Sequence, residues 1–321
     1  MRNRSLVTLM LVLALGAAGS LSAMMVALSP TDLSAQAQVI VTGTVTGVTS
    51  QWDDSHSTIY SDVTVSVERL DKGDAANRTL TVRVPGGEVG DIGMAVEDMP
   101  TFTTGQKVTL YLNPTSDRAV FKLAAGGQGT AIGGKPYYSY SGYHRDAATC
   151  NYHVNSGLEQ NWNAAIQAGA NTWSTAGSTF RFSYLGTSSN GGPTYDGINI
   201  VTRGPLGNGI LAQNTYWYNR TKHVLENDIV FNTLYQWSTS GAPGYYDVQN
   251  IGTHEQGHCL VLNDLYKSYQ SEMTMYGYGG LGETKKRTLE TGDKDGIKFI
   301  YGPGFFQTEN GPICIPVPPT R

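Results

Sequence analysis

Residues 254–258 of this sequence have the form HExxH. On a helix, His254 and His258 lie one turn apart on the same face, where both imidazoles can bind one metal ion. Glu255 lies between them and can act as the general base for a water molecule at that ion. These residue types at this spacing are typical of a catalytic zinc site.

Two histidines are too few ligands for such a site, because a catalytic zinc normally has three protein ligands and one water. Asp264 follows His258 by six residues and can reach the ion if the helix ends near Leu262 and the chain turns back. Glu272 and Glu283 are the alternatives on a second helix, but neighbouring glycines disfavour a helix there. Asp264 is therefore the predicted third ligand.

The flanking sequence predicts the elements that would hold these ligands. Asp247 is suited to cap a helix that runs from there towards Leu262. Upstream, Ser156 and Glu159 have capping-box spacing, which predicts the start of a second, longer helix. Alternating or continuous apolar runs predict strands at residues 149–154, 179–184, 198–202 and 228–232. The pattern indicates a sheet covered by helices.

At this point the sequence resembles a known family. Residues 254–264 are similar to the metzincin consensus HExxHxxGxxH/D, and residues 271–276 are similar to its Met-turn. Residues 288–302 resemble the closing helix of matrixin catalytic domains, so the resemblance to matrixin-like metzincins covers roughly residues 149–302. It implies an α+β catalytic domain with a helix-backed mixed sheet, an active-site helix and a C-terminal helix.

The resemblance also implies an activity, namely zinc-dependent hydrolysis of peptide bonds inside protein or peptide substrates. His254, His258 and Asp264 would bind Zn²⁺, with Glu255 as the catalytic base. Met275 would lie beneath the site, where its flexible thioether fills irregular space.

Residues 209–213 resemble the matrixin edge strand that lies above the cleft. By this resemblance Leu211, Ala212 and Gln213 would pair with an extended substrate through main-chain hydrogen bonds.

Two positions depart from the family consensus. Val261 stands where the family has a glycine that leaves the helix with positive φ, a conformation costly for a β-branched residue. We therefore expect the turn to form around Asn263, which tolerates that region better. Asp264 replaces the more common histidine, and its negative charge would weaken the pull of the ion on its water.

The beginning of the sequence predicts export. Arg2 and Arg4 precede an apolar run at residues 6–18, and small-residue cleavage positions occur at 22–23 and 35–37. Residues 1–37 are thus predicted to be a signal peptide, which makes the protein secreted and extracellular. Because weakly apolar residues continue to Leu28, the alternative is an uncleaved anchor that gives membrane or cell-surface association.

The remaining chain divides into two predicted domains. Residues 38–125 contain short alternating runs and turn signals, which predict a small all-β barrel or sandwich. A Gly-rich linker at 126–145 leads to the matrixin-like domain at 146–303, and a Pro-rich tail occupies 304–321. Latency, binding and assistance in folding are all open as roles for the first domain.

Charge and cysteine content limit the possible partners and crosslinks. The net charge of −4, without a basic patch, argues against nucleic-acid binding. Of the three cysteines, Cys150 and Cys314 form the preferred disulfide, which leaves Cys259 as a thiol in the metal-binding helix.

No second zinc site is predicted, because the other histidines form no recognisable ligand cluster. Calcium bound through Asp196, backbone carbonyls or other acids stays an open alternative, since oxygen-ligand sites leave little trace in a sequence.

A different class of function has to be weighed against the enzyme. The chain could be an extracellular surface-binding protein in which the metal domain is a degenerate remnant without catalysis. Glu255 argues against this alternative, because a structural zinc site is usually closed by four protein ligands and needs no base.

Overall fold

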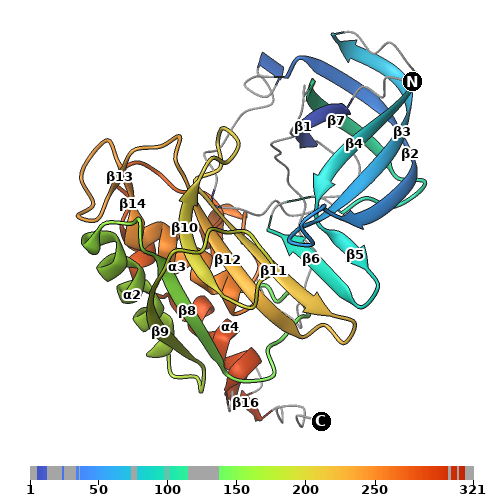
Figure 1. The fold of residues 1–321 in the computed structure, drawn as a ribbon. Coiled ribbons are helices and arrows are strands. Elements are labelled where there is room, and N and C mark those ends of the chain that lie inside the picture. The colour runs from blue at the N-terminus through green and yellow to red at the C-terminus, as the bar shows by residue number, and fades with distance from the viewer. Residues whose placement is uncertain are drawn as a thin grey trace.

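The computed structural model describes residues 6–12, 24, 34–35, 37–73, 78–97, 99, 101–114, 137–302, 305–308 and 311–314. The predicted linker up to residue 136 and the end of the predicted tail therefore lie outside the described residues. The fold is of mixed α and β type, rich in sheet and with few helices in the described part. A strand-built barrel lies beside a larger sheet that carries the helices (Figure 1).

The N-terminal region forms a closed barrel, which is one of the two architectures predicted for it, a barrel or a sandwich. Its strand order is β1-β4-β3-β2-β7. Its strands are β1 Leu6–Val12, β2 Val39–Trp52, β3 Ile59–Lys72, β4 Thr79–Pro85 and β7 Lys107–Pro114. All of them except β1 lie in the region predicted to be all-β. Alternate residues of β3 are buried, and the interior contains Val41, Val63, Val65, Val82 and Leu110. The period of two along each strand explains this one-sided burial.

Strand β1 comes from the segment that the sequence predicts to be a signal peptide. It pairs with β4 on one side and with β7 on the other, and so closes the barrel. Removal of residues 1–37 would take this strand away, and the signal peptide stays a prediction. Among the described residues, no helix is both long and apolar enough to span a membrane.

The larger sheet has seven strands in the order β5-β6-β11-β12-β10-β8-β9. They are β5 Gly87–Val89, β6 Ile92–Val96, β8 Thr149–Asn155, β9 Arg181–Ser188, β10 Ile200–Gly204, β11 Ala212–Asn219 and β12 Val224–Asn232. Strands β9, β8, β10 and β12 are parallel, whereas β11 is antiparallel to β12. The sheet is therefore mixed, and it contains all four strands predicted for this region.

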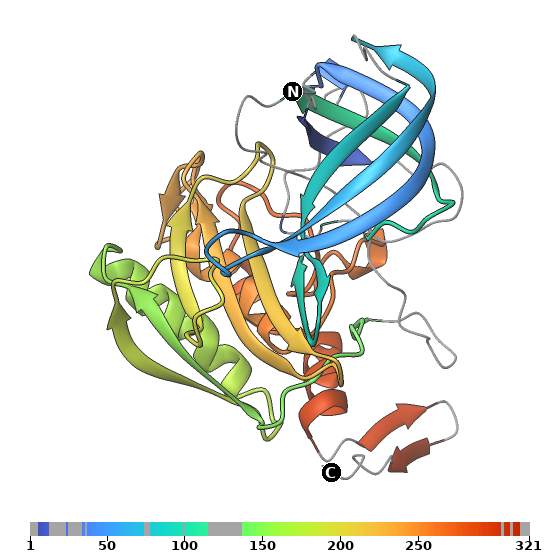
Figure 2. The same cartoon turned by 45° about the vertical axis from the view of Figure 1, so that its right-hand side comes forward.

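Strands β5 and β6 join this sheet although they belong to the N-terminal region. Strand β6 pairs with β11 in antiparallel register over five residue pairs, from Val96 opposite Thr215 to Ile92 opposite Asn219. The two regions thus share one sheet, and the hairpin runs from the barrel along β11 (Figures 1 and 2). An alternating pattern predicts a strand but does not identify its partner, so a division at residue 125 could not reveal this pairing.

The helices of the larger region lie on the same side of the sheet (Figure 1). They are α2 Gln160–Ser174, α3 Val248–Cys259 and α4 Thr291–Tyr301. Helix α2 begins later than predicted, with Glu159 as its N-cap residue and no side-chain cap, so the predicted capping box does not form. Shorter elements are β13 Trp237–Ser238, β14 Tyr246–Asp247, η1 Ser268–Gln270, η2 Lys285–Arg287, β15 Phe305–Thr308 and β16 Gly311–Cys314.

Close approach of α2 to α3 depends on Gly169. A Cβ atom at this position would lie 2.6 Å from the side-chain oxygen of Gln256 and 2.8 Å from that of Thr253. Two hydrogen bonds join the helices. The Gln256 side chain donates to the Ile166 carbonyl, and the Trp173 indole N–H donates to the Thr253 carbonyl. These contacts hold α3 firmly against the rest of the core.

Helix α3 begins as predicted at Asp247. The carboxylate accepts a hydrogen bond from the Asn250 N–H at 2.9 Å and another from the Gly241 N–H at 3.0 Å. It also forms a two-point ion pair with the Arg287 guanidinium, and the Asp247 side chain is fully buried in this pair. One side chain therefore caps the helix and anchors η2 to its start.

We predict that Asp247→Ala lowers the free energy of unfolding by about 2–4 kcal/mol, because it removes a cap and leaves Arg287 without its partner. Asp62→Ala is the matched control, since Asp62 also forms a two-point pair, with Arg83, but both side chains are about one third exposed. That change should cost about 1 kcal/mol or less. Equal losses in urea unfolding would contradict the role given to Asp247.

Candidate metal centre

Helix α3 brings the two predicted histidine ligands together. His254 and His258 are both 0% exposed, and their Nε2 atoms lie 3.2 Å apart. Each Nδ1 is 2.8 Å from a backbone carbonyl, that of Thr274 for His254 and that of Leu262 for His258. Because a carbonyl only accepts, each Nδ1 carries a proton, and in the neutral form of each ring Nε2 presents a lone pair.

Asp264 completes the group, as predicted. Its Oδ1 lies 3.0 Å from Nε2 of His254, and its Oδ2 lies 3.5 Å from Nε2 of His258. No hydrogen-bond donor reaches either carboxylate oxygen. Two lone pairs and one carboxylate thus converge in a buried space without a proton between them, an arrangement that is unfavourable unless a cation binds there. Among the described residues this is the group that could hold a metal ion.

The chain reaches Asp264 by a turn that differs from the predicted one. Helix α3 ends at Cys259, and Val261 rather than Asn263 adopts the left-handed conformation, with φ of 64°. The N–H of Leu262 bonds to the Gly257 carbonyl, and that of Val261 bonds to the His258 carbonyl. These bonds form the Schellman motif, in which glycine usually occupies the position held here by Val261.

Burial explains why valine is found there. Val261 is 1% exposed and packs with Tyr216 and Tyr218 of β11. Its apolar contacts offset a backbone strain on the order of 1–3 kcal/mol. Sequence reasoning weighed only the backbone cost, and therefore placed the turn at Asn263.

The alternative acidic ligands lie elsewhere. Glu272 forms an exposed ion pair with Lys285, and Glu283 pairs with the buried ammonium group of Lys286. Neither carboxylate belongs to the group around the histidines.

Glu255, the predicted base, is 1% exposed. Its Oε1 is buried without a hydrogen-bond partner. Burial raises the pKa of this carboxyl group to about 8, and a cation bound next to it would act in the opposite direction. The side chain therefore lies close to the centre and could exchange a proton there.

Met275 lies directly beneath the helix, as predicted. It is 1% exposed, and a Cβ atom on Gly257, between the two ligands, would overlap its sulfur. Its carbonyl accepts a hydrogen bond from the Leu265 N–H, which joins the turn to the residue after Asp264. The thioether thus supports the ligand-bearing turn of α3 from below.

Sequence reasoning missed Asp293, which binds the backbone of residues 271–276, the predicted Met-turn. Its buried carboxylate accepts hydrogen bonds from the N–H groups of Thr274 at 2.8 Å, Met275 at 3.1 Å and Glu290 at 2.9 Å. Thr274 in turn provides the carbonyl that orients His254. An aspartate in the first turn of a predicted helix was the available signal, but it did not identify these distant partners.

Glu97 is a second residue that sequence reasoning missed. It follows β6 directly, is 9% exposed, and brings Oε2 to 3.9 Å from Nδ1 of His258. Burial raises the pKa of the Glu97 carboxyl group to about 7. The N-terminal region thus places an acidic side chain next to the metal centre.

The predicted substrate strand begins one residue after Leu211. Ala212 and Gln213 are the first residues of β11 and lie opposite Phe231 and Val230 of β12. The other side of this segment also has partners. The Leu211 N–H donates to the Met24 carbonyl, and the side-chain amide of Gln213 donates to the Glu97 carbonyl.

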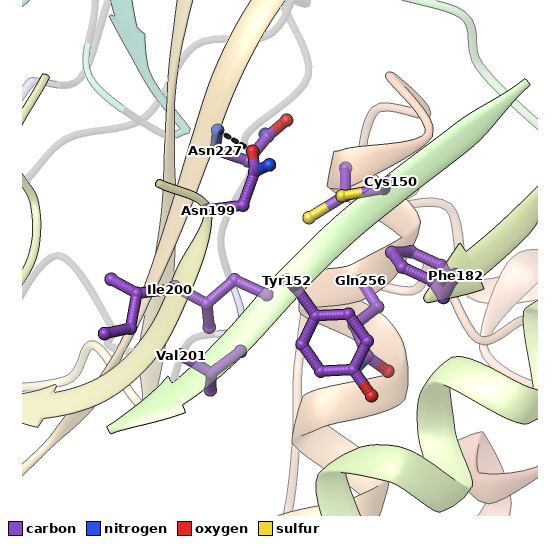
Figure 3. Close-up of a pocket in the computed structure, with 10 residues that line it drawn as sticks. Cys150, Tyr152, Phe182, Asn199, Ile200, Val201, Asn227 and Gln256 are labelled. Carbon is purple, nitrogen blue, oxygen red and sulfur yellow. Dashed lines mark hydrogen bonds between the residues drawn. The ribbon is translucent and has the colours of Figure 1, made fainter. Parts of the chain in front are cut away.

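The predicted disulfide between Cys150 and Cys314 is wrong, because Cys150 is a free thiol that is 1% exposed. Alternation along β8 turns it towards α3, where it lies within hydrogen-bonding distance of Cys259. Both cysteines line a cavity with Tyr152 and Gln256 (Figure 3). Its volume of about 10 Å³ leaves room for no more than one water molecule, which makes it a packing gap rather than a ligand site.

Other histidines, and Asp196 as the residue considered for calcium, form contacts with neighbouring protein groups. The rings of His144 and His223 lie in contact, with centroids 4.1 Å apart and planes tilted by 55°, and His223 bonds to Asp146, a contact that the sequence did not indicate. Asp196 accepts hydrogen bonds from Asn190 and from the Ile198 N–H. The absence of a second zinc and the presence of calcium both stay predictions.

Comparison with known proteins gives no family assignment. No protein-family model matches the sequence, and no curated protein sequence matches it. Inference about function therefore depends on the residues and on the geometry of the centre.

We predict that a divalent ion stabilises the metal-free protein, by about 2.7 kcal/mol at a concentration one hundred times the dissociation constant. Asp264→Asn should weaken binding of Zn²⁺ at least tenfold, because it removes the only negative charge among the three ligands. Asp91→Asn is the control, since the Asp91 side chain is 73% exposed. The measurement is the melting temperature across a zinc titration, and identical curves for both variants would refute the assignment.

We also predict that Gly257→Ala destabilises the protein by about 1–3 kcal/mol and weakens metal binding, because the added methyl overlaps Met275 and lies 2.9 Å from Trp173. Gly252→Ala is a control on the same helix, where the nearest atom to the new Cβ, in Phe231, is 3.5 Å away. Chemical unfolding and zinc titration of both variants test the prediction. A Gly257→Ala protein that behaves like the control would show that Met275 does not support the site.

Proposed function

We propose that this protein is a zinc-dependent endopeptidase of the matrixin-like metzincin type. The observation that carries the proposal is the convergence of His254, His258 and Asp264, with Glu255, whose Oε1 has no hydrogen-bond partner, next to them in the helix. The order of these residues along the chain, followed by Met275, supports the family resemblance. The single helix-backed mixed sheet is compatible with such a domain.

The ligand set supports zinc as the ion. Two imidazoles and one carboxylate are ligands that zinc binds well. In a tetrahedral site with bonds of about 2.0–2.1 Å, neighbouring ligand atoms lie about 3.3–3.4 Å apart. The separations here are 3.2 Å between the histidines, and 3.0 and 3.5 Å from these to the Asp264 oxygens. Little rearrangement is therefore needed for binding.

Bound zinc would supply Lewis acidity, which polarises a peptide carbonyl and makes water more acidic. Glu255 would accept a proton from the attacking water and return it to the leaving amine, as one peptide bond is broken and one water consumed. The carbonyls of Thr274 and Leu262 would keep both imidazoles in the ligand tautomer during this exchange. Extended polypeptides are the proposed substrates, since β11 runs next to the centre, where the Asn214 side chain donates to the Glu255 carbonyl, and could pair with one once β6 is displaced.

The alternative is an extracellular surface-binding protein whose metal has only a structural role. Full burial of the three ligands favours this alternative, because structural sites are closed to solvent. The enzyme is favoured by the number of ligands, since three leave a position that a structural site would fill with a fourth protein residue. Glu255, which has no structural partner for its Oε1, also favours the enzyme.

We predict that the zinc-loaded full chain cleaves an unfolded protein and that a chelator abolishes this cleavage. The rate of cleavage should be about 10²–10⁴-fold lower in Glu255→Gln. Both proteins carry Gly93→Val, because a side chain at residue 93 overlaps the Tyr218 ring and should open a path to the buried centre. Glutamine keeps the shape of the side chain but cannot accept the proton.

The control for this experiment is zinc content, which should be the same in both proteins because Glu255 is not a ligand. If both hold zinc and cut at the same rate, Glu255 is not the base. If both hold zinc and bind an added hydroxamate, and neither cuts, the structural-metal alternative replaces the enzyme.

A further inference from the structure

The metal centre is closed in this structure. His254 and His258 are 0% exposed, Glu255 is 1% exposed and Asp264 is 2% exposed. A polypeptide cannot reach the ligands or the base unless a covering segment moves. Parts of the N-terminal region provide that cover, although they are far from the centre in the sequence.

Strand β6 occupies the side of β11 that is not paired with β12. Its five residue pairs with β11 are antiparallel, as they would be for an extended peptide added to the sheet (Figure 2). The pairing continues beyond β6 towards the centre, where the Glu97 N–H donates to the Asn214 carbonyl at 2.9 Å. The main-chain groups on this side of β11 are therefore already used from Asn214 onwards, directly next to the predicted substrate residues 211–213.

Met24 occupies the start of the same segment. Its carbonyl accepts a hydrogen bond of 2.9 Å from the Leu211 N–H. The side chain is 0% exposed and packs near Gly279 and Ile251, within the core of the larger region. Signal cleavage at residues 22–23 would keep this contact, whereas cleavage at 35–37 would remove Met24 and leave β6 in place.

Glu97 separates the centre from a large cavity. This cavity, of about 740 Å³, lies between the barrel and the tyrosines at residues 140, 143, 216 and 218. Glu97 lines it, whereas none of the three ligands nor Glu255 is among the lining residues. Glu97 also contacts His258, so its displacement would connect the cavity to the centre.

We propose that the N-terminal region is a built-in inhibitor, in which β6 and Glu97 occupy the peptide-binding side of β11 and close the metal centre. This inference rests on the proposed peptidase function and adds its regulation. An attached strand competes at an effective concentration on the order of millimolar, so a substrate at micromolar concentration would rarely displace it. Activation would require undocking of β6, for example after cleavage of the chain that follows it.

Gly93→Val tests the inference from the inhibitor side, away from the ligands. Gly93 lies opposite Tyr218, and a Cβ at residue 93 would overlap that ring. Gly47→Val is the matched control in the barrel, where the nearest atom to the new Cβ, in Thr64, is 4.0 Å away. Glu97→Ala is a second test variant, which removes the side chain over His258 and leaves the glycine unchanged.

Two readouts are measured on the full chain. The first is access to the metal, followed in the cobalt-loaded protein as the change of its visible absorption when a tripeptide hydroxamate is added. The second is cleavage of an unfolded protein by the zinc-loaded protein. We expect Gly93→Val and Glu97→Ala to bind the hydroxamate at least about tenfold more tightly than the wild type and Gly47→Val. Cleavage should rise by a similar factor.

The two readouts separate this inference from the proposed function. Improved hydroxamate binding without cleavage would support the inhibitor and overturn the peptidase. Equal hydroxamate binding in all four proteins would overturn the inhibitor, whether or not they cleave the substrate. If Gly93→Val does not fold, as judged by circular dichroism, Glu97→Ala alone decides between these outcomes.

Discussion

The structure around the centre depends on one electrostatic constraint, the burial of three electron-pair donors that face each other. His254, His258 and Asp264 have no proton to share, because backbone carbonyls hold both Nδ1–H groups. Such an arrangement would be expelled from a protein interior without a compensating positive charge. The surrounding elements keep the three groups in place, so the centre could hold a cation that offsets this cost.

Most of that positioning comes from backbone groups rather than from side chains. The Met-turn orients one histidine and the Schellman turn after α3 orients the other, and the same turn delivers Asp264. Asp293 fixes the Met-turn through its N–H groups, and Met275 fills the space beneath α3. The three ligands therefore depend on two loops, and these loops converge because α2 and the sheet hold α3 in place.

The parts that the sequence predicted well are those with a local signal. The spacing of the two histidines, the cap at Asp247 and the strand periodicities each involve residues that lie close together in the chain. The errors arose where distant contacts decided the outcome. Val261 adopts positive φ because tyrosines of β11 bury it, and Cys150 faces Cys259 because β8 passes behind α3. Glu97 and Asp293 carried no motif, since their roles exist only in the folded chain.

The role of the N-terminal region likewise depends on contacts between residues that are distant in the sequence. A β-domain joined to a catalytic domain only by a linker would leave the side of β11 open to peptides. Here the region adds its own strand to that sheet and ends it with an acidic residue at His258. Strand addition and closure of the centre are thus one structural event, because Glu97 follows β6 directly and cannot withdraw while β6 stays paired. If the centre binds zinc and cleaves peptides, as we propose, its activity and its exposure are controlled by the same pairing.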